Sequence, residues 1–250
     1  MKTGICQLCL ETKPLIKNAH VLTEFLYDDL YNDKHKMTAF KLSKGQLKRN
    51  DNVQKGTRDD SLFCQKCDRF FGDQYENYAR KFSIKGLKKG YEPKVKSYDW
   101  GVEIFNVDFQ KYYRFLLLQL WRMSLSKFEG YSAIDLGENH NETIRGFLKN
   151  PDIILTGKEY PVTFQYALEP GLRELVISFG KKRDKNSIPY YLVKAGFFIW
   201  IFYVKSPSHK LPTNIDNIRL RSDKFIAIKV IPTVKRIIEN KVSEILKSWY

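Results

Sequence analysis

The sequence predicts an α+β protein, in which helices are followed by an antiparallel sheet and a last helix. Three observations predict this class. Apolar residues recur at helical intervals between residues 108 and 148, strand-like segments rich in Val, Ile, Phe and Tyr follow, and Pro232 opens another helical pattern. Helices and strands that are segregated along the chain in this way are typical of the α+β class.

The first segment of the chain, residues 1–97, contains all four cysteines, and we expect it to form a module that ends near Ser97. An extended stretch and then a helical pattern lie within Lys13–Leu30. Lys34–Arg58 is polar and basic, and its glycines and asparagines predict a loop. After Cys67, aromatic residues recur at helical intervals and predict a helix that reaches about Phe82.

The second segment, residues 98–250, is expected to form a larger α+β domain with substrate, partner or regulatory contacts. A wide apolar face predicts a helix over Asp108–Ser126, with Asp108 as its cap, and a second helix covers Asn139–Leu148. The strands and the last helix are then predicted at Tyr160–Leu168, Leu172–Phe179, Tyr190–Lys205, Lys224–Val230 and Pro232–Trp249.

The charge of the chain is strongly positive, with 43 Lys and Arg against 28 Asp and Glu, a net charge of +15. A polyanionic partner is the usual reason, nucleic acid first and an anionic membrane surface second; a basic charge that serves solubility alone is the alternative. Two basic runs, Lys34–Arg58 and Arg80–Lys96, are either solvated loops or arms that contact phosphates. The candidate phosphate contacts are Lys48, Arg49, Lys85, Lys88 and Lys89.

No segment of the sequence predicts targeting or a membrane span. Met1–Leu10 lacks the apolar core of a signal peptide. The longest apolar run, Ala195–Val204, is shorter than the about 20 residues that a spanning helix needs. We therefore expect a soluble, cytoplasmic protein.

The four cysteines form two Cys-x-x-Cys pairs, Cys6 with Cys9 and Cys64 with Cys67. A single pair of this kind also occurs in redox proteins. Two pairs in a reducing compartment are better explained as four thiolates around one metal ion, because two such tight turns complete a tetrahedron of sulfur ligands. We therefore predict one structural zinc ion, with a sizeable insertion between the pairs.

Two residues beside these pairs are suited to catalysis: His20, within an apolar stretch, and Asp68, directly after the second pair. An imidazole can act as a base near neutral pH, and a carboxylate can hold a hard cation such as Mg²⁺. Glu76 follows on the same predicted helix. Structural roles are the alternatives: His20 as a hydrogen-bonded core residue, Asp68 as a helix cap, and Glu76 as a solvated side chain.

The order of these motifs resembles the zinc-containing branch of the HNH nucleases. The resemblance covers about Gly4–Phe82 and rests on a Cys-x-x-Cys pair, a His followed by two apolar residues, and a second pair that opens a helix. It implies a treble-clef (ββα-metal) module in which zinc only holds the fold. On this resemblance His20 is the general base, and Asp68, with Glu76, binds a catalytic Mg²⁺ or Mn²⁺.

Softer likenesses and some departures accompany this pattern. Leu118–Ser124 and Asp135–Gly137 resemble the second half of related bacterial proteins, some of which look associated with defence against phage. Ala19 and Thr23 stand where the family often has an acidic residue and a proline.

We therefore expect a metal-dependent HNH-like endonuclease that hydrolyses DNA phosphodiester bonds, with a role in anti-phage defence. The alternative is a non-catalytic, zinc-dependent nucleic-acid-binding subunit of a larger defence complex. DNA is the expected partner and no membrane contact is expected. A protein partner or a homo-oligomer stays open.

Overall fold

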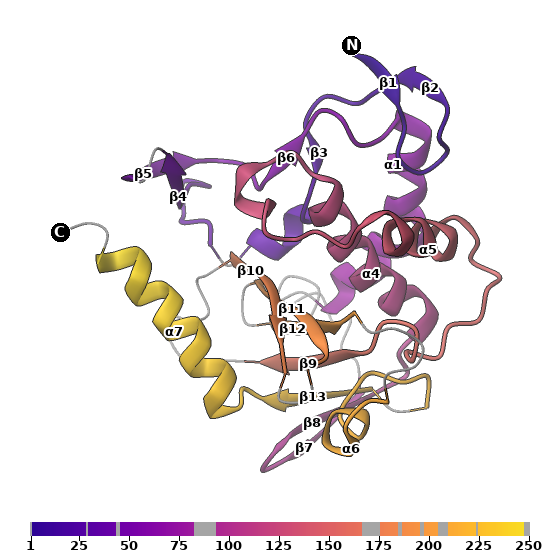
Figure 1. Ribbon diagram of the computed structural model, residues 1–250, viewed down its shortest axis with the longest axis vertical. Coiled ribbons are helices and arrows are strands. Elements are labelled where there is room, and N and C mark those ends of the chain that lie inside the picture. Colours follow the sequence, from indigo (N-terminus) through magenta and orange to yellow (C-terminus); the bar gives the residue numbers. More distant parts are fainter. Residues whose placement is uncertain are drawn as a thin grey trace.

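A computed structural model of the protein describes residues 2–28, 30–43, 46–82, 94–166, 176–184, 187–195, 198–204, 210–223 and 225–247. Its largest element is a seven-stranded sheet. The strands lie side by side in the order β10 (Val176–Arg183), β11 (Pro189–Ala195), β12 (Phe198–Tyr203), β9 (Val162–Tyr166), β13 (Phe225–Lys229), β8 (Gly101–Phe105) and β7 (Lys94–Tyr98). Helices accompany this sheet in separate parts of the chain, so the α+β class is confirmed (Figure 1).

The long helices of the second segment lie close to their predicted positions. They are α4 (Phe109–Leu125), α5 (Glu138–Lys149) and α7 (Pro232–Lys247), with the shorter η4 (Glu129–Tyr131) and α6 (Thr213–Asp216) between them. The predicted cap is also confirmed: the Asp108 carboxylate accepts a hydrogen bond from the backbone N–H of Lys111 (3.0 Å). This side chain satisfies one of the N–H groups that the first turn of a helix leaves unpaired.

The sheet differs from the prediction in three respects. The run Tyr190–Lys205, expected as one strand, contains two, β11 and β12, which pair antiparallel to each other. Both strands are buried, so together they read as one apolar run in the sequence. The sheet is not wholly antiparallel, since β13 pairs with β9 in parallel. Finally, the β7–β8 hairpin lies where we expected the end of the first module.

The N-terminal part consists of short elements. They are β1 (Thr3–Ile5), β2 (Thr12–Pro14), β3 (Ala19–His20), the 3₁₀ turn η1 (Glu24–Tyr27), β4 (Met37–Ser43), β5 (Gln46–Val53), β6 (Arg58–Asp59), α1 (Gln65–Phe71), the π-helical turn η2 (Gly72–Glu76), α2 (Asn77–Ala79) and the 3₁₀ turn η3 (Arg80–Phe82). β1 pairs with β2, β3 with β6, and β4 with β5, all antiparallel. The helix predicted after Cys67 is present from α1 to η3, with an inserted π turn in its middle.

The loop predicted for Lys34–Arg58 is wrong, because β4 and β5 form a hairpin within it (Figure 1). Phe40 and Leu42 alternate with polar residues in the sequence, which is the two-residue period of a strand. The many lysines, asparagines and glycines around them hide this period. The hairpin is inserted between the two short strands β3 and β6, which themselves pair.

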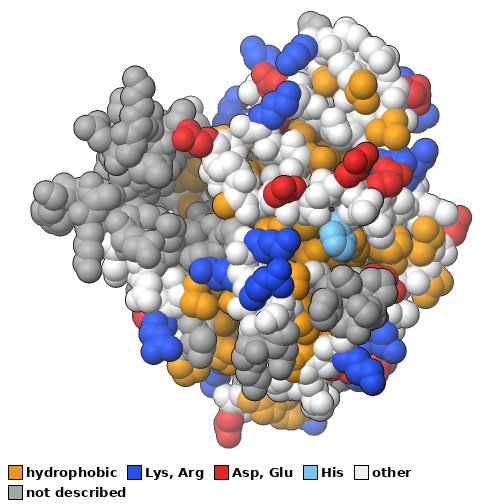
Figure 2. All heavy atoms as spheres, in the orientation of Figure 1, with side chains coloured by type: hydrophobic (Ala, Val, Ile, Leu, Met, Phe, Trp, Pro, Cys, Tyr) orange, Lys and Arg blue, Asp and Glu red, His pale blue; other side chains and the backbone are white. Residues whose placement is uncertain are grey.

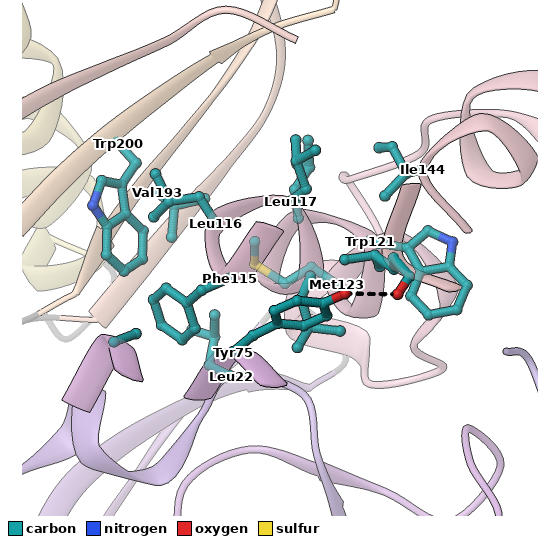
Figure 3. Close-up of a cluster of buried hydrophobic side chains, with 14 of the residues drawn as sticks. Leu22, Tyr75, Phe115, Leu116, Leu117, Trp121, Met123, Ile144, Val193 and Trp200 are labelled. Atoms are coloured by element: carbon teal, nitrogen blue, oxygen red, sulfur yellow. Dashed lines mark hydrogen bonds between the residues drawn. The ribbon is translucent and has the colours of Figure 1, made fainter. Parts of the chain in front are cut away.

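Helix α4 is the centre of the main core. From the first turn to the last, most of its side chains are buried, including Trp121 and the arginines Arg114 and Arg122. Figure 3 shows Leu22 and Tyr75 of the N-terminal part packed beside α4, and the Tyr75 hydroxyl donates to the carbonyl of Leu148 (2.9 Å). One cluster of buried side chains therefore runs across residue 97. The division into domains 1–97 and 98–250 stays a prediction.

A second, smaller cluster lies where α6 and α7 meet the sheet. It contains Ile215 of α6, Val234 and Ile238 of α7, and Leu192 and Ile199 of the sheet. Among the described residues, no helix is both long enough and apolar enough to cross a bilayer.

Candidate functional site

The four cysteine side chains converge on one point, with all their sulfur atoms within 4.8 Å of one another. The first pair lies in the turn between β1 and β2, where the backbone N–H of Leu10 donates to the carbonyl of Cys6 (2.8 Å) and Leu10 has a φ of 62°. The backbone N–H of Cys64 contacts the sulfur of Cys6 (3.4 Å). This contact joins the second pair to the first.

The chemistry of this cluster fits a structural metal such as zinc. All four thiols are free of disulfides, and three of them are buried. Burial raises the pKa of the Cys67 thiol, and the sulfurs of Cys64 and Cys6 raise it further. A tetrahedral Zn²⁺ would hold all four cysteines as thiolates, and its charge would offset the burial that disfavours the Cys67 thiolate. The predicted ligand set Cys6, Cys9, Cys64 and Cys67 is thus brought together as a metal-binding cluster.

Short backbone pairings connect this cluster to His20 and Asp68. Leu15 bridges to Cys64, and the strand β3, which ends at His20, follows a few residues later. Helix α1 begins directly after Cys64 and carries Asp68 in its first turn. Cys64 itself is the N-cap residue, so Asp68 is not the N-cap, although its carboxylate lies in the first turn, where a negative charge is favourable. Asp68 sits one turn inside the helix, where its backbone N–H donates to the carbonyl of Cys64 (3.0 Å).

His20 is held by a carboxylate. Its Nε2 lies 2.9 Å from Oε2 of Glu24, and both side chains are about one-third exposed. The same carboxylate accepts hydrogen bonds from the Tyr31 hydroxyl, from the backbone N–H of Gly56 (3.3 Å) and from Nη2 of Arg58 (3.3 Å). Burial acts to raise the pKa of Glu24, but the hydrogen bonds from His20 and Tyr31 outweigh it, and the pKa falls to about 2. Glu24 is therefore ionised at neutral pH.

Asp68 and Glu76 share one cation, Arg122 of α4. Nη1 of Arg122 lies 2.5 Å from Oε1 of Glu76, and Nη2 lies 3.7 Å from Oδ1 of Asp68. The Thr23 hydroxyl also donates to Glu76 Oε1 (2.6 Å), and the Thr23 backbone N–H donates to Oε1 of Gln119 (3.0 Å). Glu76 is therefore largely buried, with its Oε1 held by Thr23 and Arg122, so its interpretation as a solvated helix residue is wrong.

The Arg122 guanidinium is enclosed. Its side chain is 1% exposed and lies over the rings of Phe63 and Phe71, with centroid distances of 5.4 and 5.2 Å. Its Nε and Nη2 have no hydrogen-bond partner among the described residues. Cation–π contact and the two carboxylates therefore supply most of its stabilisation.

Electrostatics place His20 in the same neighbourhood as the two acids. Burial raises the pKa of Asp68, while Arg122 and His20 act to lower it. Burial also acts to raise the pKa of Glu76, but Arg122 and the Thr23 hydroxyl outweigh it, so the pKa of Glu76 is lowered. His20 is close enough to both carboxyls that a proton on its ring would act to lower the pKa of each.

This neighbourhood is not a preformed ligand set for a cation. Within the described part of the chain, one group of three or more Cys, His, Asp or Glu side chains is close enough to share an ion, and that group is the four cysteines. His20, Asp68 and Glu76 do not form such a group here, because Glu76 faces Thr23 and Arg122.

The predicted phosphate contacts are outside what the structure describes. Lys85, Lys88 and Lys89 belong to residues 83–93, and for Lys48 and Arg49 only the backbone in β5 is described. Figure 2 shows Lys and Arg side chains in several separate groups on one face, with Asp and Glu side chains among them. The expected interface with DNA therefore stays a prediction.

Sequence reasoning missed two residues of this site, Glu24 and Arg122. Both carried a signal. Glu24 follows His20 by four residues, and Arg122 is a cation within the apolar run of α4. A charged residue on the buried face of a helix requires a partner, but the sequence does not show which acid supplies it.

Comparison with known proteins finds no matching family model, no matching curated protein and no matching solved structure.

Proposed function

We propose that this protein is a metal-dependent nuclease that hydrolyses DNA phosphodiester bonds at the site formed by His20 and Asp68. In this proposal the N-terminal part is a treble-clef module of the HNH type, held by zinc on its four cysteines. The resemblance in the order of motifs supports the proposal, as does the net charge of +15.

The observation that carries the proposal is a local arrangement of two short strands and one helix around the cysteine cluster. β3 and β6 pair through Ala19 with Asp59 and His20 with Arg58, and α1 leaves the cluster at Cys64 with Asp68 in its first turn. An imidazole and a carboxylate are thereby held beside a rigid, metal-compatible anchor. A base and a cation-binding group are the two requirements for hydrolysing a phosphodiester.

The reaction follows from these two side chains. A water molecule attacks the phosphorus atom and its proton passes to the His20 imidazole. The bond from phosphorus to the leaving oxygen breaks, and this oxygen keeps the bonding electron pair and takes a proton from solvent water. Asp68 would hold the divalent cation, which when bound supplies positive charge against the charge that develops on the phosphate. Glu76 contacts Thr23 and Arg122. We therefore propose that Glu76 connects the helix of Asp68 to α4 and does not itself bind the cation.

One observation favours a second function, that of a zinc-dependent nucleic-acid-binding subunit without catalysis. Arg122 already lies between the two carboxylates where a catalytic cation would be expected. A guanidinium fixed there neutralises Asp68 and Glu76 without any metal. In this case the module is a scaffold, and a role in phage defence would depend on the rest of a larger assembly.

A plasmid-cleavage assay with Mg²⁺ or Mn²⁺ separates the two functions. The wild type is expected to cut only with metal, and His20→Ala is expected to lower the rate by about 10²–10⁴. His140→Ala is the matched control, because His140 pairs with Tyr160 outside this network. Zinc content and circular dichroism should be unchanged in both variants. DNA binding without cleavage under either metal would support the scaffold function.

Asp68→Asn tests the cation-binding role. The change keeps the shape of the side chain and removes its charge. Because Asp68 is 37% exposed and lies 3.7 Å from Arg122, we expect thermal stability to change little. Cleavage should fall and should require a higher metal concentration. Unchanged metal dependence in Asp68→Asn would contradict the assignment.

A further inference from the structure

The Glu24 carboxylate connects His20 to both ends of the inserted hairpin β4–β5. Tyr31, which precedes the hairpin, donates to Oε1, whereas Gly56 and Arg58, which follow it, donate to Oε2. His20 Nε2 lies on Oε2 as well. One carboxylate thus joins His20 and Tyr31, which are near it in sequence, to the segment that follows the hairpin.

The protonation of Glu24 determines which ring nitrogen of His20 carries the hydrogen. An ionised carboxylate can only accept hydrogen bonds, so Nε2 must be the donor in the contact of 2.9 Å. A neutral imidazole with its hydrogen on Nε2 has its lone pair on Nδ1. No described residue forms a hydrogen bond with Nδ1 of His20.

We infer that Glu24 is a positioning residue: it fixes His20 with the hydrogen on Nε2 and presents Nδ1 as the atom that accepts a proton. The catalytic consequence rests on the proposed function, whereas the pairing itself does not. The donors at the two ends of the hairpin hold the carboxylate in place, so the seating of this insertion and the orientation of the imidazole are coupled.

The pairing is measured directly by ¹H–¹⁵N NMR of the imidazole at pH 8 on the full chain with zinc bound. An imidazole N–H in open contact with water exchanges too fast to be seen, whereas one held by a carboxylate is protected. We expect a protected proton on Nε2 of His20 in the wild type and its loss in Glu24→Ala and Glu24→Gln. Glu129→Gln, which makes the same chemical change at an exposed position, should leave the signal unchanged.

Tyr31→Phe tests the coupling to the insertion without removing the carboxylate. It deletes the donor to Oε1 and leaves the contact of His20 with Oε2. The Nε2 proton should remain visible but exchange faster with water. An unchanged exchange rate would overturn the coupling.

Cleavage gives the second readout. Loss of an outer group that orients a catalytic side chain costs about 10–100-fold in activity, and this is the fall expected for Glu24→Ala and Glu24→Gln. The inference is overturned if the protected proton is on Nδ1, if it is absent from the wild type, or if Glu24→Ala cleaves at the wild-type rate. If the wild type cleaves nothing while the Nε2 proton is present and depends on Glu24, the nuclease proposal fails and the pairing stands.

Discussion

Arg122 pairs unequally with two acids, Glu76 and Asp68. The guanidinium is buried and lies 2.5 Å from Glu76, but its distance to the half-exposed Asp68 is 3.7 Å. The short, enclosed contact is the one that resists separation, because water screens it least. Asp68 is therefore the less tightly held of the two acids, while Glu76 is paired closely with Arg122.

Replacing Arg122 by Met is expected to destabilise the protein by about 3–5 kcal/mol. The reason is that Glu76 then keeps a charge in a largely buried place with only Thr23 to hydrogen-bond it. Urea unfolding followed by circular dichroism measures the change.

The double variant Arg122→Met with Glu76→Gln distinguishes the stranded charge from lost packing. It should recover part of the stability, since no unpaired charge is left. Arg221→Met is the control, because its partner Asp223 is 69% exposed and the loss should be about 1 kcal/mol or less. If Arg122→Met unfolds like the control, the pair is not important for stability.

At the scale of elements, the strands around the cysteine cluster are too short to be stable alone. β3 and β6 have two residues each, and β1 and β2 have three. Even a longer isolated pair of strands is marginal in water. The metal-compatible cluster and the packing against α4 must supply what local structure does not.

Zinc removal should therefore unfold this part of the molecule. We expect one zinc ion per chain by elemental analysis, and loss of both zinc and N-terminal structure in Cys64→Ser. The binding free energy of structural zinc, about 10–16 kcal/mol in small modules, is as large as the whole stability of a typical domain. Gln65→Ser, at the exposed neighbouring position, should keep its zinc. A folded wild type that contains no metal would contradict this prediction.

The basic run after η3 is expected to contact DNA through phosphates. Reversing Lys85, Lys88 and Lys89 to Glu should weaken binding to all DNA sequences alike and reduce the dependence of affinity on salt. Reversal of three exposed lysines elsewhere, Lys149, Lys158 and Lys210, changes the net charge equally and is the control. Fluorescence anisotropy at several salt concentrations measures both. Equal losses in the two variants would indicate that only the net charge matters.

At the scale of the whole molecule, stability in acid should depend on Glu24. Its pKa is lowered to about 2 from the usual 4.5, so the folded state binds a proton less readily than the unfolded chain. The resulting stabilisation is fully present above about pH 5 and is lost as the pH falls toward 2. At neutral pH it amounts to roughly 3 kcal/mol at most.

Glu24→Gln should therefore be less stable than the wild type at pH 7, and the difference should shrink as the pH falls from 5 to 3. Urea unfolding of both proteins at each pH measures this difference, and the loss of zinc in acid affects both alike. Glu129→Gln should differ from the wild type by the same small amount throughout. A difference that grows in acid would have the opposite sign to the one expected from a lowered pKa.

The sequence by itself determined the parts of the fold that depend on local patterns. The Asp108 cap and the helical period place α4 within a residue at each end, and α5 and the start of α7 were equally clear. The spacing of the four cysteines was enough to predict the metal-compatible cluster, because two Cys-x-x-Cys turns have few other uses in a reducing environment.

Tertiary structure alone decided which distant residues meet. The parallel pairing of β13 with β9 joins strands that lie some sixty residues apart, and local period carries no information on such pairing. For the same reason Glu24 and Arg122 could not be assigned partners beforehand. Arg58, which pairs with Glu24, follows the inserted hairpin. Glu76 and Asp68, which pair with Arg122, belong to the helical stretch of the first segment. Only folding brings these charges within a few ångströms, where Coulomb attraction in a poorly hydrated site becomes strong.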